Sequence, residues 1–162
     1  MLMPDLYLTS VHTLDLEELS RGGYDTLLVD LDNTLLPRDT NEIPEDLRAW
    51  ASGLHDSGFK VCLVSNNWHA RVKEIADELG FMLVAKAVKP LPFAFLRALG
   101  KAGSSRRKAV VIGDQVFTDV LGGKLLGMRT VLVEPLSETD LPHTLLLRRL
   151  ERMVLAGRSP LS

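Results

Sequence analysis

The fold of this chain is indicated by one stretch of its sequence, YDTLLVDLDNT at residues 24–34. The apolar run that ends at Val29 lies between two glycines and a pair of carboxylates, which is typical of a parallel strand buried on both faces. Asp30 and Asp32 therefore emerge where a strand gives way to a loop, and ligands of open α/β sheets bind at such strand ends. This position favours a chemical role for the two carboxylates. An isolated Asp-x-Asp pair is equally consistent with a plain turn, because turns are rich in Asp.

Three further segments place polar residues at the ends of predicted strands. Ser65 follows one apolar run, Lys89 follows a second, and Asp114 follows a third, with Asp119 five positions beyond Asp114. The order along the chain is carboxylates, hydroxyl, lysine and carboxylates. This order makes a catalytic interpretation of the first Asp pair much stronger than the pair alone allows.

The four motifs together resemble those of the haloacid dehalogenase superfamily of phosphohydrolases. The segments around them are similar to the YqeG branch of subfamily IIIA, which is itself similar to the mitochondrial-type phosphatidylglycerophosphate phosphatases. The segments are PDLY at 4–7, DLDNTL at 30–35, SNN at 65–67, GDQ at 113–115 and TDVLGG at 118–123. Relatives often carry Asn-Arg after the two glycines, whereas this chain has Lys124-Leu125. The resemblance therefore implies the catalytic motifs but not the substrate contacts near that helix.

Length and composition indicate one globular domain over residues 1–162. Hydrophobic residues make up 46% of the 162 positions, enough for a substantial core. The net charge of −2 argues against general nucleic-acid binding. The single cysteine, Cys62, lies in an apolar strand and is best interpreted as a small buried side chain.

Localisation signals point to a cytoplasmic protein. No disulfide can form within a chain that has one cysteine, which fits a reducing compartment. The first residues lack the basic and apolar regions of a signal peptide, and no stretch is apolar enough to span a bilayer. A peripheral position at the membrane is expected if the substrate is a lipid.

Strands and helices alternate along the chain, which predicts right-handed βαβ crossovers and a three-layer, Rossmann-like α/β sandwich. The family resemblance implies the strand order 3-2-1-4-5. We expect strands at about 26–30, 60–64, 82–85, 109–112 and 130–133, and helices at about 45–57, 70–79, 93–102 and 118–126.

The distances between motifs leave no room for a cap domain over the site. The segments from Thr34 to Ser65 and from Ser65 to Lys89 can each hold little more than one helix and a neighbouring loop or strand. An open site suits a phosphate on a bulky body, such as a lipid headgroup or a macromolecule. It also suits a homo-oligomer in which a neighbouring subunit forms the lid.

The C-terminal segment predicts an amphipathic helix at about 143–157. Such a helix with basic flanks can pack on the domain or lie on an anionic membrane, and packing is the commoner outcome. Its apolar positions are Leu146, Leu147, Leu150, Met153 and Val154, and its polar positions are Arg148, Arg149, Glu151 and Arg152. A further basic cluster at residues 101–108 is expected to be solvated, or to face phosphate-rich partners.

The motifs support covalent phosphoryl transfer. Asp30 is the expected nucleophile and forms an aspartyl-phosphate. Asp32 is the expected general acid for the leaving alcohol and then the base for water, because close carboxylates disfavour double ionisation. Thr34 would orient the loop by hydrogen bonding.

A cluster of carboxylates would repel a phosphate unless a cation is present, and Mg²⁺ fits this requirement. Asp30 and Asp114 are expected as side-chain ligands and Asp32 as a backbone-carbonyl ligand, with Asp119 as an outer partner. The phosphoryl oxygens would be bound by Ser65, the backbone N–H of Asn66, and Lys89.

Three residues near these motifs are weaker candidates. His69 is expected to be an exposed residue at a helix start, and Trp68 either lines the entrance or lies at a packed edge. Arg71 can reach the mouth of the site, but a solvated helix face is the expected position.

The sequence therefore predicts a capless, Mg²⁺-dependent phosphomonoesterase. Phosphatidylglycerophosphate is implied as its substrate only by the resemblance. The alternatives are a soluble phosphatase for a sugar phosphate, nucleotide or phosphoprotein, and an interaction module without activity.

Overall fold

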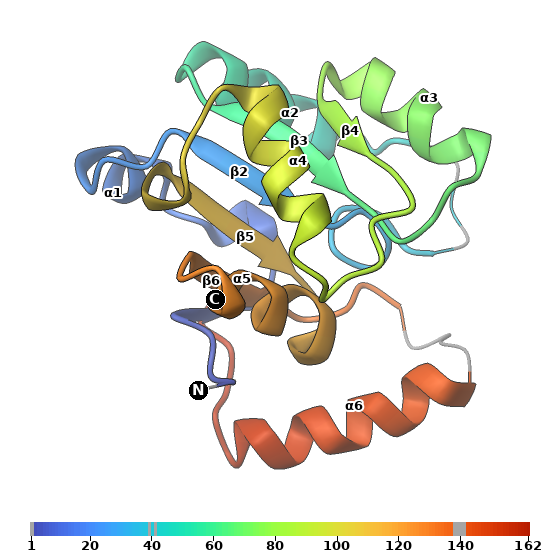
Figure 1. Cartoon of the computed structure of the whole chain (residues 1–162). Helices are drawn as coiled ribbons and strands as arrows, with labels where there is room; N and C mark the ends of the chain where they lie inside the picture. Colours follow the sequence, from blue (N-terminus) through green and yellow to red (C-terminus); the bar gives the residue numbers. More distant parts are fainter. Residues whose placement is uncertain (1, 39, 41, 138–141) are drawn as a thin grey trace.

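The computed structural model describes residues 2–38, 40, 42–137 and 142–162, and in the last range it describes side chains from residue 148 onward. Its centre is a six-stranded sheet with the order β1-β6-β5-β2-β3-β4, in which all neighbours are parallel. Helices cover both faces of the sheet, so the predicted three-layer α/β fold is confirmed (Figure 1). The strands are β1 (Leu6–Leu8), β2 (Thr26–Val29), β3 (Lys60–Val64), β4 (Met82–Val84), β5 (Ala109–Gly113) and β6 (Arg129–Val133).

The five predicted strands correspond to β2 through β6, and they have the predicted order 3-2-1-4-5. The edge strand β1 was not predicted, because three residues are too few to show a period. Asp5, just before it, accepts hydrogen bonds from the backbone N–H of Thr130 at 2.8 Å and from Lys124 Nζ at 2.9 Å. These bonds hold the N-terminal segment beside β6.

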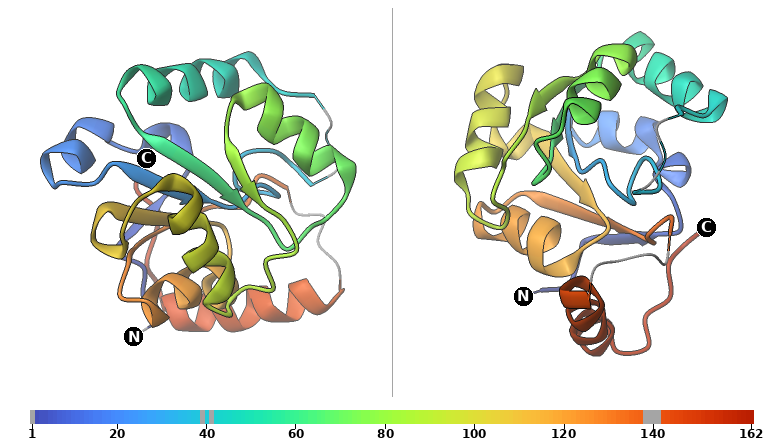
Figure 2. Two further views of the ribbon diagram at one scale, coloured as in Figure 1. Left: turned by 45° about the horizontal axis from the view of Figure 1, so that its top comes forward. Right: turned by 90° about the vertical axis from the view of Figure 1, so that its right-hand side faces the viewer.

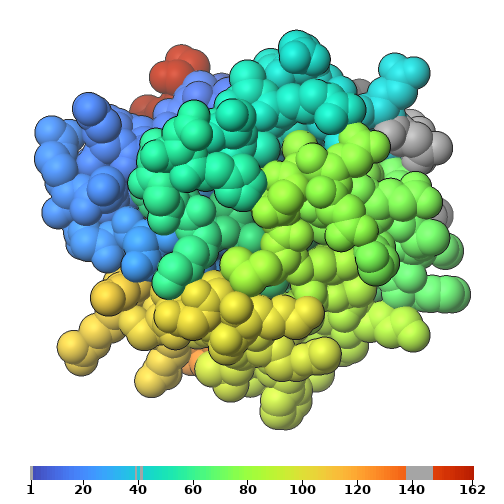
Figure 3. Space-filling view, turned by 90° about the horizontal axis from the view of Figure 1, so that it is seen from above, coloured from blue at the N-terminus to red at the C-terminus, as the bar shows by residue number. Residues whose placement is uncertain are grey.

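One face of the sheet is covered by α1 (Leu16–Arg21), α2 (Glu45–Asp56) and α3 (Ala70–Leu79). Successive side chains of a strand point to opposite faces, so Leu27 and Val29 pack under these helices while Leu28 points to the other side. From above, the surface over α1, α2 and α3 is continuous (Figure 3). No cap domain interrupts β2 to β4 in the part of the chain that the structure describes.

The other face is covered by α4 (Phe93–Ala102) and α5 (Leu121–Leu125), as the side view shows (Figure 2). A Cβ atom on Gly122 would lie 2.4 Å from Phe95, and one on Gly123 would lie 2.6 Å from Thr130. The two glycines therefore let α5 approach both α4 and the sheet. The helix predicted at 118–126 is divided, because a π-helical turn, η3 (Val116–Val120), precedes α5. Short 3₁₀ turns, η1 (Val11–Thr13) and η2 (Arg106–Lys108), complete the elements.

The helix α6 (Pro142–Leu155) lies along one side of the domain (Figure 1). It packs through Val154 and Leu155 against a small apolar cluster that includes Val116 and Leu132. Of the predicted apolar stripe, Val154 packs on the domain, whereas Leu150 and Met153 are exposed. The side chains of its other members, Leu146 and Leu147, lie outside the described residues. No helix among the described residues is long and apolar enough to cross a bilayer.

Candidate active site

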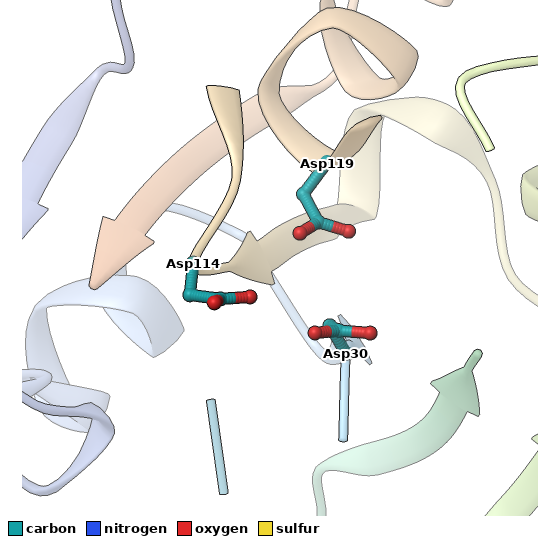
Figure 4. A group of neighbouring side chains, drawn as sticks. All are labelled: Asp30, Asp114 and Asp119. Atoms are coloured by element: carbon teal, nitrogen blue, oxygen red, sulfur yellow. The ribbon is translucent and has the colours of Figure 1, made fainter. Parts of the chain in front are cut away.

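Two neighbouring strands bring the first and last motifs together. Val29 of β2 pairs with Ile112 of β5, so the residues that follow both strands meet at one edge of the sheet. Asp30, Asp114 and Asp119 each offer a carboxylate oxygen within 4.8 Å of the others. The three side chains point toward a common space (Figure 4). Carboxylates that lie far apart in the sequence therefore form one cluster.

The loop after β2 is shaped by a tight turn. Asn33 has a positive φ of 62° and is fully buried, and its N–H donates to the carbonyl of Leu36 at 2.7 Å. The turn places the Thr34 hydroxyl 3.2 Å from Asp30 Oδ2 and 3.3 Å from Asp114 Oδ1, so it can donate to either carboxylate. Thr34 therefore links the two carboxylates that were expected to share a metal ion.

Asp32 is turned away from this cluster toward α3. Its Oδ2 accepts from Asn67 Nδ2 at 3.3 Å, and its Oδ1 accepts from Arg71 Nη1 at 3.0 Å. Arg71 also donates from Nε to the carbonyl of Thr40 at 2.8 Å. The expected solvated position of Arg71 is therefore wrong, because this side chain joins Asp32 to the loop before α2. The long guanidinium stem reaches acceptors that its position on the helix does not reveal.

Lys89 lies inside the cluster, where its side chain is 3% exposed. Its Nζ donates to Asp30 Oδ1 at 2.8 Å and to Asp119 Oδ1 at 2.7 Å. Burial alone lowers the pKa of Lys89, but the charges of Asp119 and Asp30 outweigh it and hold this pKa above its usual value. Lys89 is therefore a fixed positive charge beside Asp30.

The loop after β3 is held against Lys89. Asn66 Oδ1 accepts from the backbone N–H of Lys89 at 2.8 Å. The Ser65 hydroxyl is buried and accepts from the N–H of Asn67 at 3.1 Å. Asn66 thus contacts the lysine directly, and Ser65 lies in the same loop.

Asp119 comes from η3 and packs against the end of β5. A Cβ atom on Gly113 would lie 2.1 Å from its carboxyl carbon, so only glycine leaves room for this side chain. Its Oδ2 accepts from the N–H of Gln115 at 3.3 Å. Burial raises the pKa of Asp119 to about 6, because the nearby Asp30 charge adds to burial while Lys89 only partly offsets it.

Two residues of α6 reach the loop that joins β5 to η3, and neither was predicted at the site. Arg148 donates to both the backbone carbonyl and the carboxylate Oδ2 of Asp114. Glu151 is buried, and its Oε1 accepts from the N–H of Val116 at 2.7 Å and of Phe117 at 3.4 Å. Arg148 and Glu151 also contact each other, at 3.3 Å. The sequence indicates them only as polar positions of this helix, whereas in the structure they bind acceptors and donors of the loop between β5 and η3.

The cluster is a suitable donor set for a hard divalent cation. Burial and the Asp30 charge raise the pKa of Asp114 well above its usual value, although Arg148 partly lowers it. Such raised pKa values indicate carboxylates that need more positive charge than the protein supplies. Arg148 occupies Asp114 Oδ2, whereas among the described residues Oδ1 accepts only from the Thr34 hydroxyl that also reaches Asp30, so Oδ1 is the oxygen placed to bind a cation. Oxygen ligands of this kind suit Mg²⁺.

A cavity of about 640 Å³ lies beside Asp114, under α6. Apolar residues such as Leu132 and Leu155 form part of its wall, together with Tyr7, Arg148 and Arg152. Of the three clustered carboxylates, Asp114 is the one that lines this cavity, next to Arg148.

The remaining sequence candidates lie at the margin. His69 is exposed at the start of α3, as predicted, and Trp68 is 63% exposed and stacks on it. Lys124 pairs with Asp5 rather than with the carboxylate cluster. Cys62 is fully buried, as expected.

Comparison with known proteins points to one family. A family model described as HAD-hydrolase-like matches residues 87–139. The probable phosphatase YqeG of Bacillus subtilis (strain 168) is 36% identical over 155 residues, which cover 96% of this chain and 90% of that protein. The phosphatidylglycerophosphate phosphatase 1, chloroplastic/mitochondrial, of Arabidopsis thaliana is 26% identical over 170 residues. That match covers 95% of this chain and 46% of the plant protein.

A solved structure shares the fold. It is the cobalt-bound form of the deoxy-D-mannose-octulosonate 8-phosphate phosphatase YrbI from Haemophilus influenzae, with a TM-score of 0.54 and 14% identity. The match covers 83% of this chain and 88% of that chain. At this identity the likeness concerns the arrangement of strands and helices alone.

Proposed function

We propose that this chain, which belongs to the haloacid dehalogenase superfamily and there to the branch of the probable phosphatase YqeG, is a Mg²⁺-dependent phosphomonoesterase that works through a phosphorylated Asp30. The chain is a phosphatase of this superfamily; the cofactor, the intermediate and the substrate are the proposal. The main support for the proposed mechanism is the ion pair between Asp30 and the buried Lys89, which lies within a group of three carboxylates.

In the first half of the reaction, a carboxylate oxygen of Asp30 attacks the phosphorus atom of the ester. The bond between phosphorus and the alcohol oxygen breaks, and Asp32 gives its proton to that oxygen. Lys89 balances negative charge on Asp30 and on the phosphoryl group throughout. Ser65 and the N–H of Asn66 bind the phosphoryl oxygens.

In the second half, Asp32 takes a proton from water, and the water oxygen attacks the phosphorus atom of the acyl phosphate. Inorganic phosphate leaves and Asp30 is restored. Arg71 and Asn67 hold the Asp32 side chain in place through hydrogen bonds to both of its oxygens. Their contacts explain how Asp32 stays clear of the cluster and remains available for proton transfer.

Asp30, Asp114 and the backbone carbonyl of Asp32 would hold the Mg²⁺ ion. When bound, the ion supplies positive charge that offsets the repulsion between the carboxylates and the phosphate. Asp119 serves as an outer partner, because both of its oxygens already accept hydrogen bonds from Lys89 and Gln115.

A lipid phosphate monoester, phosphatidylglycerophosphate, is the substrate we propose. The capless topology supports it, since nothing among the described residues closes over the cluster from α2 or α3. The similarity to the plant enzyme of that name points the same way. A soluble sugar phosphate, nucleotide or phosphoprotein is the rival substrate class.

A substrate screen tests the proposal. The full chain is incubated with Mg²⁺ and either phosphatidylglycerophosphate in mixed micelles or a set of soluble phosphate monoesters, and released phosphate is measured. We expect the highest kcat/KM for the lipid. Higher kcat/KM for a soluble monoester would reject the lipid assignment, and no release from any substrate would reject the enzymatic one.

Arg148 acts, in this proposal, as a positioning residue for Asp114. Arg148→Ala should weaken Mg²⁺ affinity by about 10- to 100-fold, because partners that orient metal ligands typically contribute this much. Titration calorimetry with Mg²⁺ measures the affinity without turnover. The matched control is Arg149→Ala, because Arg149 neighbours Arg148 and is exposed. Unchanged Mg²⁺ affinity in a folded Arg148→Ala protein would contradict this role.

A further inference from the structure

Apolar side chains gather at one margin of the candidate site. Five large hydrophobic residues are exposed there, and we call them the apolar rim: Trp68 (63%), Val88 (62%), Leu91 (48%), Phe93 (67%) and Leu96 (47%). They come from the loop after β3 and from the segment that joins β4 to α4 and begins α4 (Figure 1). Isolated exposed hydrophobic residues are ordinary, but a contiguous group marks an interaction site.

Backbone contacts join the two loops that carry the rim. The N–H of Lys86 donates to the carbonyl of Asn67 at 3.3 Å, and Lys86 Nζ lies 5.3 Å from the centre of the Trp68 ring. The N–H of Leu91 donates to the carbonyl of Val88 at 3.1 Å. The two loops are thus held side by side.

The helical part of the rim continues the same surface. Phe93 and Leu96 are three residues apart at the start of α4, so they lie on one side of the helix. Ala94 and Phe95, between them, are buried against the sheet. The rim is therefore an outward face that the domain core does not use.

The chain segment that carries four of the five rim residues has charges of one sign. No Asp or Glu occurs from Leu79 to Gly113, a stretch that contains seven Lys and Arg residues. Two of them, Lys86 and Arg97, are exposed within the rim segment. An apolar surface with cations and without nearby acidic residues in its own segment suits an anionic lipid interface.

The rim borders the catalytic residues. Val88 directly precedes Lys89, whose Nζ contacts Asp30, and Trp68 follows Asn66 by two residues. A surface that holds the rim would therefore lie next to the place where the phosphoryl group is bound. This is the position that a phosphate on a membrane lipid requires.

We propose that the apolar rim, with Lys86 and Arg97, docks the protein on an anionic membrane surface and presents the site to lipid headgroups. The proposal rests on the proposed function for its choice of substrate, but the docking itself is a separate property. It is an alternative to a membrane contact through α6, whose Arg148 and Glu151 bind the η3 loop. A protein partner would be a different occupant of the same surface.

Vesicle co-sedimentation tests the docking without turnover. The full chain is mixed with vesicles of phosphatidylcholine and phosphatidylglycerol, and with vesicles of phosphatidylcholine alone. We expect binding to the anionic vesicles that weakens as salt is raised. The double variant Phe93→Ser with Leu96→Ser should bind them about tenfold less tightly or worse, because two apolar side chains no longer insert.

A second pair of variants tests the charges. Lys86→Glu with Arg97→Glu should weaken binding to anionic vesicles by about tenfold or more, because each cation near such a surface contributes substantially. Lys60→Glu is the control, since Lys60 is exposed at the opposite end of the sheet. This pair also keeps the test valid if the first double variant does not fold, as a melting curve would reveal.

The α6 helix supplies the matched apolar control. Leu150→Ser with Met153→Ser removes two exposed hydrophobic residues from α6 and should leave vesicle binding unchanged. Loss of binding in this control alone would assign the membrane contact to α6 and overturn the proposal. So would wild-type binding by the folded rim variants, or a change in oligomeric size in those variants without any change in vesicle binding.

Turnover then separates docking from catalysis. The Phe93→Ser and Leu96→Ser variant should hydrolyse a small soluble phosphate at the wild-type rate but lose activity on phosphatidylglycerophosphate in vesicles. An equal loss on both substrates would contradict docking as the role of the rim. If the wild-type protein binds vesicles but releases phosphate from neither substrate, the proposed function fails while the docking surface stands.

Discussion

Asp30→Asn should lower kcat by about 10⁴-fold or more, because the neutral amide oxygen cannot act as the nucleophile. The fold should survive. Asp30 lies just beyond the end of β2 and contributes no core side chain, and its charge raises the pKa of both Asp114 and Asp119. Removing it relieves that repulsion, while Lys89 keeps its contact with Asp119. Steady-state turnover of an aryl phosphate, with circular dichroism for the fold, measures the effect.

A matched control separates the nucleophile from a general loss of charge. Asp56→Asn makes the same chemical change at the exposed end of α2 and should leave kcat unchanged. A folded Asp30→Asn protein with near-normal turnover would show that another group attacks the phosphate.

Removal of divalent cations should abolish activity, and Mg²⁺ should restore it. At neutral pH the three clustered carboxylates outnumber the cations Lys89 and Arg148, so the site lacks positive charge. Ca²⁺ should substitute poorly, because its looser coordination does not preserve in-line geometry. Turnover after treatment with EDTA, and after each metal is added back, tests the expectation.

Mg²⁺ should also raise the Tm, which gives a readout independent of activity. The pKa of Asp119 in the folded chain, about 6, lies above its unfolded value, so ionised Asp119 destabilises the metal-free fold as the pH rises through about 6. The Mg²⁺-induced rise in Tm should therefore be larger at neutral pH than at pH values below 6. Full activity in excess chelator, or a Tm that does not respond to Mg²⁺, would contradict the metal assignment.

Asp114 and Asp119 should differ in how much each contributes to Mg²⁺ binding. Asp114→Ala should weaken Mg²⁺ binding more than Asp119→Ala, because in the part of the chain that the structure describes Asp114 Oδ1 accepts only from the Thr34 hydroxyl, whereas both oxygens of Asp119 accept hydrogen bonds, from Lys89 and from the Gln115 backbone. Calorimetry on the two variants ranks them. If Asp119→Ala weakened Mg²⁺ binding more, Asp119 rather than Asp114 would be the direct metal ligand.

The sequence predicts the fold well where patterns are long and local. The helices at 70–79 and 93–102 have the observed bounds of α3 and α4, because each has a clear apolar face and a glycine at its end. The four motifs meet because they follow parallel strands whose carboxyl ends lie at one edge of the sheet. These patterns can be recognised in the sequence alone, before any tertiary contact is known.

The site contacts that the sequence does not predict are made between residues far apart in the chain. Arg71 and Arg148 sit on helices whose charge patterns are typical of solvated faces, yet each reaches a carboxylate from another motif. Glu151 binds the N–H groups that open η3, a turn that the sequence does not distinguish from an α-helix. Side-chain reach and loop geometry decide these contacts, and neither leaves a periodic signal.

The central claim is that Asp30 carries the phosphoryl group. A crystal structure of the full chain with Mg²⁺ and beryllofluoride, a mimic of an acyl phosphate, tests it most directly. We expect a beryllium atom joined to a carboxylate oxygen of Asp30, with Lys89 beside its fluorides. Beryllofluoride joined to Asp32, Asp114 or any other residue would mean that Asp30 is not the nucleophile.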